Sequence, residues 1–94
     1  MKATKASEVL NFSDIPNIGP KMAEDFFKLK IDTPADLKMK DAYTLYKKLG
    51  VMAGERPDPC VLDTYLAAID FMNGAPSKPW WKYTAQRKRK YPDC

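Results

Sequence analysis

Apolar residues recur along this chain at the spacing of α-helices. Met22, Phe26 and Leu29 stand at i, i+4 and i+7, on one helix face, and residues 59–72 keep the same period for longer. Nowhere do apolar and polar residues alternate strictly over the length of a strand. The pattern predicts a small all-α domain of about five helices.

Residues typical of helix starts and stops divide this pattern into segments. Ser, Thr and Asp cap helix N-termini, and Pro suits the first helical position because it lacks an N–H. The predicted helices are Glu8–Phe12 after Ser7, Pro20–Leu29, Pro34–Leu37 after Thr33, Ala42–Leu49 after Asp41, Pro59–Met72 after Asp58, and a fraying helix Thr84–Lys90. Gly50 is expected to end the fourth of these and to open a loop over residues 51–58.

The predicted core follows from the apolar faces of these helices. Besides the apolar face of the helix over residues 59–72, the residues expected inside the core include Val9, Leu10, Phe12, Phe26 and Phe27. Trp80 and Trp81 cannot face the same way on a helix, so one should pack on the body and the other should be partly exposed. Residues 1–90 are expected to form a single domain and residues 91–94 a disordered tail.

Residues 15–23 hold the residue types of a tight turn followed by a helix start. Asn17 and Gly19 adopt positive φ more readily than most residues, and the proline that follows suits the first helical position. The first amides of a helix have no intrahelical acceptor, so those of Met22 and Ala23 should point outward unpaired. Such a terminus favours an anion such as phosphate.

This segment resembles the helix-hairpin-helix motif of DNA-binding proteins, for which the fold would be SAM-like. The matching residues are Ile15, Pro16, Ile18, Gly19, Pro20, Lys21 and Ala23. Asn17 stands where the motif usually has its first glycine, and Asn tolerates the left-handed region that the turn needs. The resemblance implies a hairpin that holds a DNA backbone phosphate without reading sequence; a hairpin that serves only as a packing corner is the alternative. The residues implied in the DNA contact are Asn17, Ile18, Gly19, Lys21, Met22 and Ala23.

The positive charge of the chain is concentrated in its C-terminal segment. Residues 78–94 hold six basic residues and one acidic one, whereas residues 1–77 hold ten basic and eleven acidic ones. A basic segment on a nearly neutral body suits either DNA or an acidic protein. The basic residues expected to join the DNA contact are Arg87, Lys88, Arg89 and Lys90.

Residues for catalysis and metal binding are scarce. The chain has no His, which removes the commonest general base and metal ligand, and Cys60 and Cys94 lack a C-x-x-C spacing. We therefore expect free thiols, no enzyme activity, no catalytic residue, no metal and no cofactor. Because no apolar run approaches membrane-spanning length and no signal peptide is visible, we expect a cytoplasmic protein that does not bind membranes.

A second resemblance covers residues 10–90. The chain is similar to small bacterial proteins of the pathogenicity-locus and mitomycin-resistance family, and to the C-terminal domain of the competence regulator TfoX. The segments that carry this similarity are residues 15–20, 33–37, 58–60 and 79–83. The resemblance implies an all-helical fold and a link to DNA, whereas the mitomycin label is not taken as an enzyme activity.

Two functions are compatible with the sequence. The first is a non-sequence-specific module for double-stranded DNA, linked to the DNA damage response, that holds phosphate through hairpin amides and Lys21. The second is a protein-interaction adaptor that presents the two tryptophans and the basic C-terminal segment. A protein partner or a homodimer is open with either function. Glu24 and Asp25, next to the hairpin, count against DNA because they repel phosphate.

Overall fold

The fold is built from helices in the part of the chain that the structure, a computed structural model, describes, which is residues 2–92. The α-helices are α1 Pro20–Lys28, α2 Ala42–Ala53, α3 Pro59–Met72 and α4 Thr84–Lys90. Four short 3-10 helices accompany them: η1 Ala6–Glu8, η2 Phe12–Asp14, η3 Pro34–Met39 and η4 Trp80–Tyr83. No strand occurs within the described range. The predicted all-α class is confirmed.

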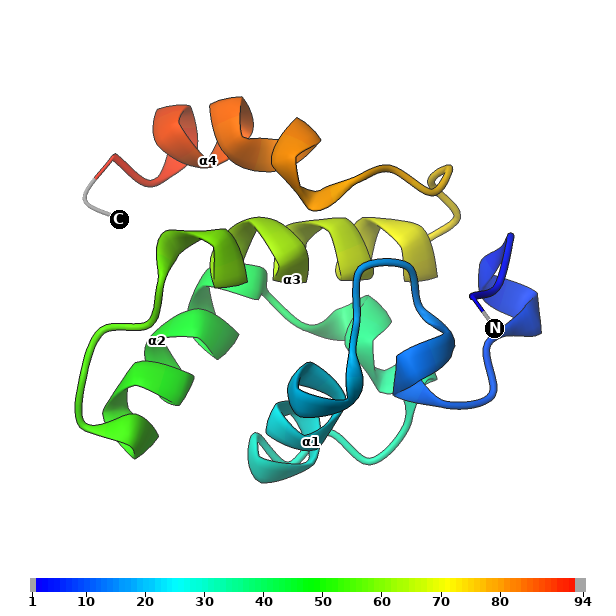
Figure 1. Ribbon diagram of the computed structural model, residues 1–94, viewed down its shortest axis with the longest axis horizontal. Coiled ribbons are helices and arrows are strands. Elements are labelled where there is room, and N and C mark those ends of the chain that lie inside the picture. The colour runs from blue at the N-terminus through cyan, green and yellow to red at the C-terminus, as the bar shows by residue number, and fades with distance from the viewer. Residues whose placement is uncertain (1, 93–94) are drawn as a thin grey trace.

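Helix α3 lies at the centre of the molecule. Figure 1 shows it crossing the middle of the view, with α4 along one side and α1 and α2 on the other. Most of its residues are buried, because neighbours pack on both of its sides. At the start of α3, the Asp58 carboxylate accepts a hydrogen bond from the Cys60 amide at 3.0 Å. At its end, Asn73 is the C-cap residue, and Gly74 follows with a φ of 102°. Both ends are as predicted.

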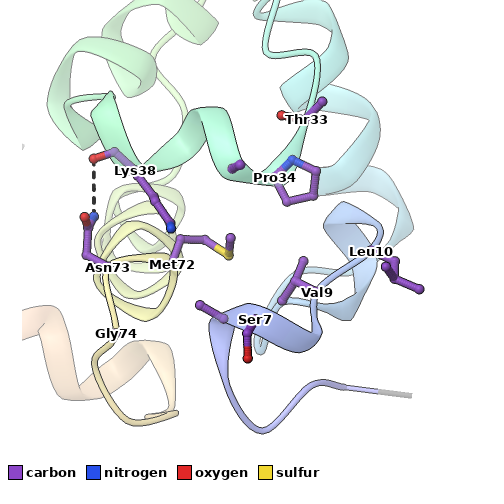
Figure 2. Close-up of a pocket in the computed structure, with 11 residues that line it drawn as sticks. Ser7, Val9, Leu10, Thr33, Pro34, Lys38, Met72, Asn73 and Gly74 are labelled. Atoms are coloured by element: carbon purple, nitrogen blue, oxygen red, sulfur yellow. Dashed lines mark hydrogen bonds between the residues drawn. The ribbon is translucent and has the colours of Figure 1, made fainter.

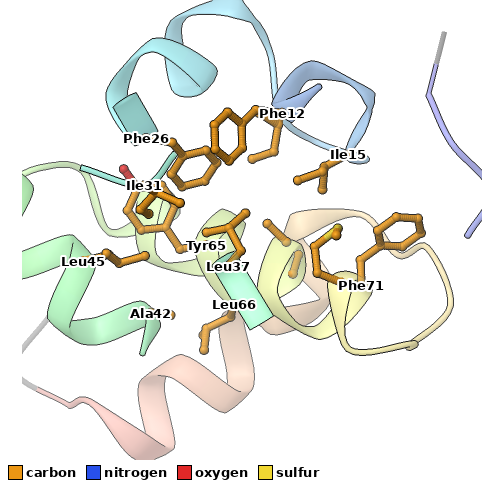
Figure 3. Packing of buried hydrophobic residues seen from close by; sticks show 14 of the residues in the cluster. Phe12, Ile15, Phe26, Ile31, Leu37, Ala42, Leu45, Tyr65, Leu66 and Phe71 are labelled. Atoms are coloured by element: carbon orange, nitrogen blue, oxygen red, sulfur yellow. The ribbon is translucent and has the colours of Figure 1, made fainter. Parts of the chain in front are cut away.

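The core is a continuous set of aromatic and aliphatic side chains contributed by η2, the following turn, α1, η3, α2 and α3 (Figure 3). The ring centroids of Phe12 and Phe26 lie 5.1 Å apart, and those of Phe26 and Tyr65 lie 5.2 Å apart. Aromatic pairs at such spacings attract one another beyond the burial of their area. Ile15 and Ile18 are fully buried, so the turn between them is anchored to the core at both ends.

The predicted helix Glu8–Phe12 does not form. The Asp14 carboxylate accepts the amides of Leu10 and Asn11 at 3.0 and 2.9 Å, and this capping starts the short η2 turn instead. The backbone is extended at Val9 and Asn11, and the Leu10 side chain between them is 82% exposed. The prediction that Leu10 is buried was therefore wrong.

Phe27 was also predicted inside the core and is instead 59% exposed. Consecutive helix residues point about 100° apart, and α1 turns Phe26 towards the core. Phe27 meets Phe12 edge-on at the rim, with 5.1 Å between the ring centroids.

Helix α2 continues beyond Gly50, which was expected to end it. The helix runs to Ala53 and ends at Gly54, which has the left-handed φ of 76° that glycine permits. Gly50 serves close packing, because a Cβ on it would lie 3.0 Å from Cδ of Pro57. The Tyr46 hydroxyl donates to the Pro57 carbonyl at 2.5 Å and holds the loop against the helix.

Helix α4 is fastened to α3 by a buried ion pair. The Arg87 Nε lies 2.6 Å from Asp63 Oδ1, and the Thr84 hydroxyl donates to Asp63 Oδ2 at 2.8 Å. Beyond the helix, Tyr91 stacks on Tyr43 of α2 with 4.4 Å between ring centroids. The predicted disordered tail begins at this anchored residue, and its last two positions, 93 and 94, lie outside the described residues.

Candidate nucleic-acid interface

The hairpin segment, residues 15–20, contains a tight turn that follows from its sequence. The Ile18 amide donates to Ile15 O at 3.1 Å, with Pro16 and Asn17 between them and a φ of 74° at Asn17. Proline followed by a residue of positive φ is the signature of a type II turn. The prediction for Asn17 is confirmed. The prediction for Gly19 is wrong, because its φ of −90° and ψ of 179° are ordinary extended backbone.

The turn leaves the N-terminus of α1 without a side-chain cap. Gly19 is the N-cap residue and has no side chain to accept the first amides, whereas Asp41 caps α2 by accepting the Thr44 amide at 3.0 Å. The Ala23 amide is already bonded to Gly19 O at 3.0 Å. Within the described residues, the amides without a backbone or side-chain acceptor at this end are those of Gly19, Lys21 and Met22.

These amides differ in part from the set expected from the sequence. Met22 is unpaired as predicted, whereas Ala23 makes the first helical bond and Ile18 closes the turn. The Ile18 side chain is buried in the core. The amide of Lys21 was not predicted to take part, although its position as the second helical residue could have indicated it.

The charges around this terminus are of both signs, because Asp25 and Glu55 border the same pocket as Lys21. The first turn of α1 contains no acidic residue, and the Lys21 side chain is exposed. The positive end of the helix dipole adds to that charge. Glu24 belongs to the second turn, where its carboxylate lies 3.8 Å from the Lys28 ammonium.

The side chain of Asn17 joins the hairpin segment to a distant part of the chain. Its Nδ2 donates to Lys78 O at 2.8 Å, across 61 positions of sequence. Two residues further on, η4 carries the tryptophan pair, with ring centroids 5.6 Å apart in an edge-to-face arrangement. Trp81 is 58% exposed and Trp80 is intermediate in exposure, so the expected partly exposed ring is found, whereas the packing of the other ring on the body stays a prediction. No local sequence signal indicated the contact with Lys78.

The basic residues of α4 do not lie with the hairpin segment. Figure 1 shows the C-terminal end of α4 over the side of α2, away from the turn that precedes α1. The Arg87 side chain is 9% exposed and bound to Asp63, so it does not present its charge to a ligand. Lys88, Arg89 and Lys90 are exposed. The predicted interface is therefore divided between two surfaces.

A surface groove lies where η1 meets the end of α3 (Figure 2). It has a volume of about 610 Å³ and is bordered by Val9, Pro34 and Met72, while the side-chain Nδ2 of Asn73 donates to Lys38 O at 3.3 Å at one end. Among the residues that line it, Lys38 alone carries a charge. Its other polar lining residues are Ser7, Thr33 and Asn73.

The free thiol of Cys60 is a candidate nucleophile. It donates to Asp58 Oδ1 at 2.6 Å, and this hydrogen bond to a carboxylate, with burial, raises the pKa of the thiol. The protonated form is therefore favoured, which disfavours attack by the thiolate. In the described range, no three His, Cys, Asp or Glu residues gather as a metal site would require. No helix in residues 2–92 combines the length and apolar character needed to span a bilayer.

Comparison with known proteins places this sequence in a family. The model of the pathogenicity-locus family, Cdd1, matches residues 5–89. The chain is 37% identical over 84 residues to a protein of Streptomyces lavendulae named mitomycin resistance protein McrB, with 89% of this chain and 80% of that protein covered. No solved structure matches the chain. Because the family model spans nearly the whole sequence, the chain belongs to the pathogenicity-locus family.

Proposed function

We propose that this protein binds the backbone of double-stranded DNA through the N-terminus of α1, without reading base sequence. The observation that carries the proposal is the set of three unpaired amides on Gly19, Lys21 and Met22 at an uncapped helix start. Backbone amides and a helix dipole together make a phosphate site. Lys21 is the second residue of α1, and its ammonium group can add a charge-assisted contact with the same phosphate.

The open surface at Gly19 supports the same function. A Cβ built on this residue would meet no atom within 4 Å, and its backbone dihedral angles suit any residue. Neither internal packing nor φ therefore requires a glycine here. A glycine does, however, let an external group approach the backbone closely.

We extend the proposal to a binding module that is not an enzyme and acts in the response to DNA damage. The resistance in the name of the Streptomyces relative is the support for that pathway. The support for a non-catalytic role is that the sequence has no His and that the Cys60 thiol, hydrogen-bonded to Asp58, has a raised pKa.

Reversing the charge of Lys21 should weaken binding to duplex DNA by about tenfold or more at moderate salt, uniformly across sequences. The variant should neutralise one phosphate fewer, so the slope of log affinity against log salt concentration should become shallower by about 0.9. Fluorescence anisotropy with two unrelated duplexes at two salt concentrations measures both quantities. Lys40→Glu is the matched control, because it makes the same charge change at a distant place. Lys40 precedes the N-terminus of α2, whereas Lys21 lines a pocket with Leu49 and Ala53 near the C-terminal end of α2. If Lys21→Glu and Lys40→Glu bind DNA equally well, α1 is not the DNA site.

A protein-interaction adaptor is the second candidate, favoured by the exposure of Trp81. This ring is 58% exposed, and it is held edge-to-face against Trp80. Exposed tryptophans that are held in place are common anchors of protein interfaces. The basic residues Lys88 and Arg89 would then face an acidic partner.

A further inference from the structure

The side chain of Lys2 binds carbonyl groups of the hairpin segment and of η2, which precedes it. The Lys2 ammonium donates to Ser13 O at 2.7 Å, to Ile15 O at 3.1 Å and to Ile18 O. These three bonds use all the donors that an ammonium group has. Three carbonyl dipoles are thus directed at one cation, which removes the repulsion that they would otherwise exert on one another.

The bond to Ile18 O also sets the direction of the next amide. In a planar trans peptide, the C=O and the N–H point in opposite directions, and the described residues contain no cis peptide bond. Because the Ile18 carbonyl points at Lys2, the Gly19 N–H of the same peptide points away from it. This N–H is one of the three amides at the start of α1 that lack an acceptor within the described residues.

We propose that Lys2 is a positioning residue for the phosphate site, whose ammonium holds the Ile18–Gly19 peptide so that the Gly19 amide faces the ligand. This inference rests on the function proposed above. Without the ammonium, the carbonyl groups of Ser13, Ile15 and Ile18 lose their shared donor, and the peptide is free to rotate towards water. The phosphate then loses one aligned donor.

The surroundings of Lys2 agree with this role. Partial burial lowers the pKa of Lys2, and the nearby Asp14 carboxylate opposes that shift. The Ala3 amide donates to Asp14 O at 2.8 Å and fixes the backbone beside Lys2. Lys5 is exposed, as Lys2 is, but it is the N-cap residue of η1 without a side-chain hydrogen bond, so it carries the same charge without binding these carbonyl groups.

Lys2→Ala should weaken binding to duplex DNA by roughly tenfold, whereas Lys5→Ala should change it by less than about twofold. Ammonium chloride should restore part of the affinity of Lys2→Ala, because a free ammonium ion can donate to the same carbonyls. Tetramethylammonium chloride at the same concentration screens charge equally but has no N–H, so it should restore nothing. Lys2→Arg, which keeps several donors, should retain most of the affinity.

The nuclear magnetic resonance signal of the Gly19 amide in DNA-free protein tests, independently of DNA binding, whether Lys2 holds the Ile18–Gly19 peptide. It should move in Lys2→Ala, stay in place in Lys5→Ala and return with ammonium. If the parent chain binds no DNA, the proposed function fails and this signal alone reports whether Lys2 holds the peptide. The inference is overturned if the signal is unchanged in Lys2→Ala, if Lys2→Ala and Lys5→Ala bind alike, or if tetramethylammonium restores binding as well as ammonium does.

Discussion

Replacing Asp63 by Asn should lower the free energy of unfolding by about 3–5 kcal/mol, because it leaves a buried guanidinium without its counter-charge. The Asp63 side chain is 1% exposed, and it binds both Arg87 and Thr84 of the helix that packs on α3. Restoring the missing solvation would require α4 to move away from α3. The loss should therefore be far larger than that of an ordinary surface substitution.

Urea unfolding followed by circular dichroism measures this loss. Arg89→Met is the matched control, because it removes a charge from the same helix at an exposed position, and it should stay within about 0.5 kcal/mol of the parent. The double variant Asp63→Leu with Arg87→Met should recover much of the stability, since an apolar pair needs no solvation. An Asp63→Asn variant that unfolds at the parent's urea concentration would contradict the role of the ion pair.

Adding a side chain at Gly19 should reduce DNA affinity by about tenfold for Ala, and further for Val, with little effect on folding. Apart from the two residues next to it in sequence, a Cβ at this position meets no atom of the described chain within 4 Å, so its clash would be with an approaching phosphate. The stability cost should be about 1 kcal/mol, the usual difference between glycine and an alkyl residue at an N-cap. Binding and thermal unfolding measured on the same samples separate the two effects. A Gly19→Val variant that binds DNA like the parent would place the ligand elsewhere.

Local signals in the sequence predicted the elements that depend on neighbouring residues. Asp41 and Asp58 cap the helices expected of them, because a cap acts over two or three positions. Asn17 has the expected positive φ for the same reason. The start of α1, and with it the position of the candidate phosphate site, was therefore predictable.

Features that depend on distant partners were not predictable in this way. Gly50 looked like a helix stop, yet it is a glycine because the ring of Pro57 packs against it. Arg87 looked like part of a solvated basic run, yet its partner Asp63 lies 24 positions away. The hydrogen bond from Lys2 to the Ile18 carbonyl likewise joins residues 16 positions apart. Periodicity and capping rules carry no information about such pairings.

The central claim, that the start of α1 holds a DNA phosphate, is tested most directly by the amide resonances of ¹⁵N-labelled protein during titration with a short duplex. The signals of Gly19, Lys21 and Met22 should shift together, by similar amounts for unrelated sequences, and should return towards their starting positions as salt is raised. Amide signals of residues 88–90 on the exposed face of α4 are the internal reference, and they should shift less than those of the three α1 residues. Shifts confined to residues 88–90 or to the indole of Trp81, with the three α1 amides unmoved, would contradict the claim.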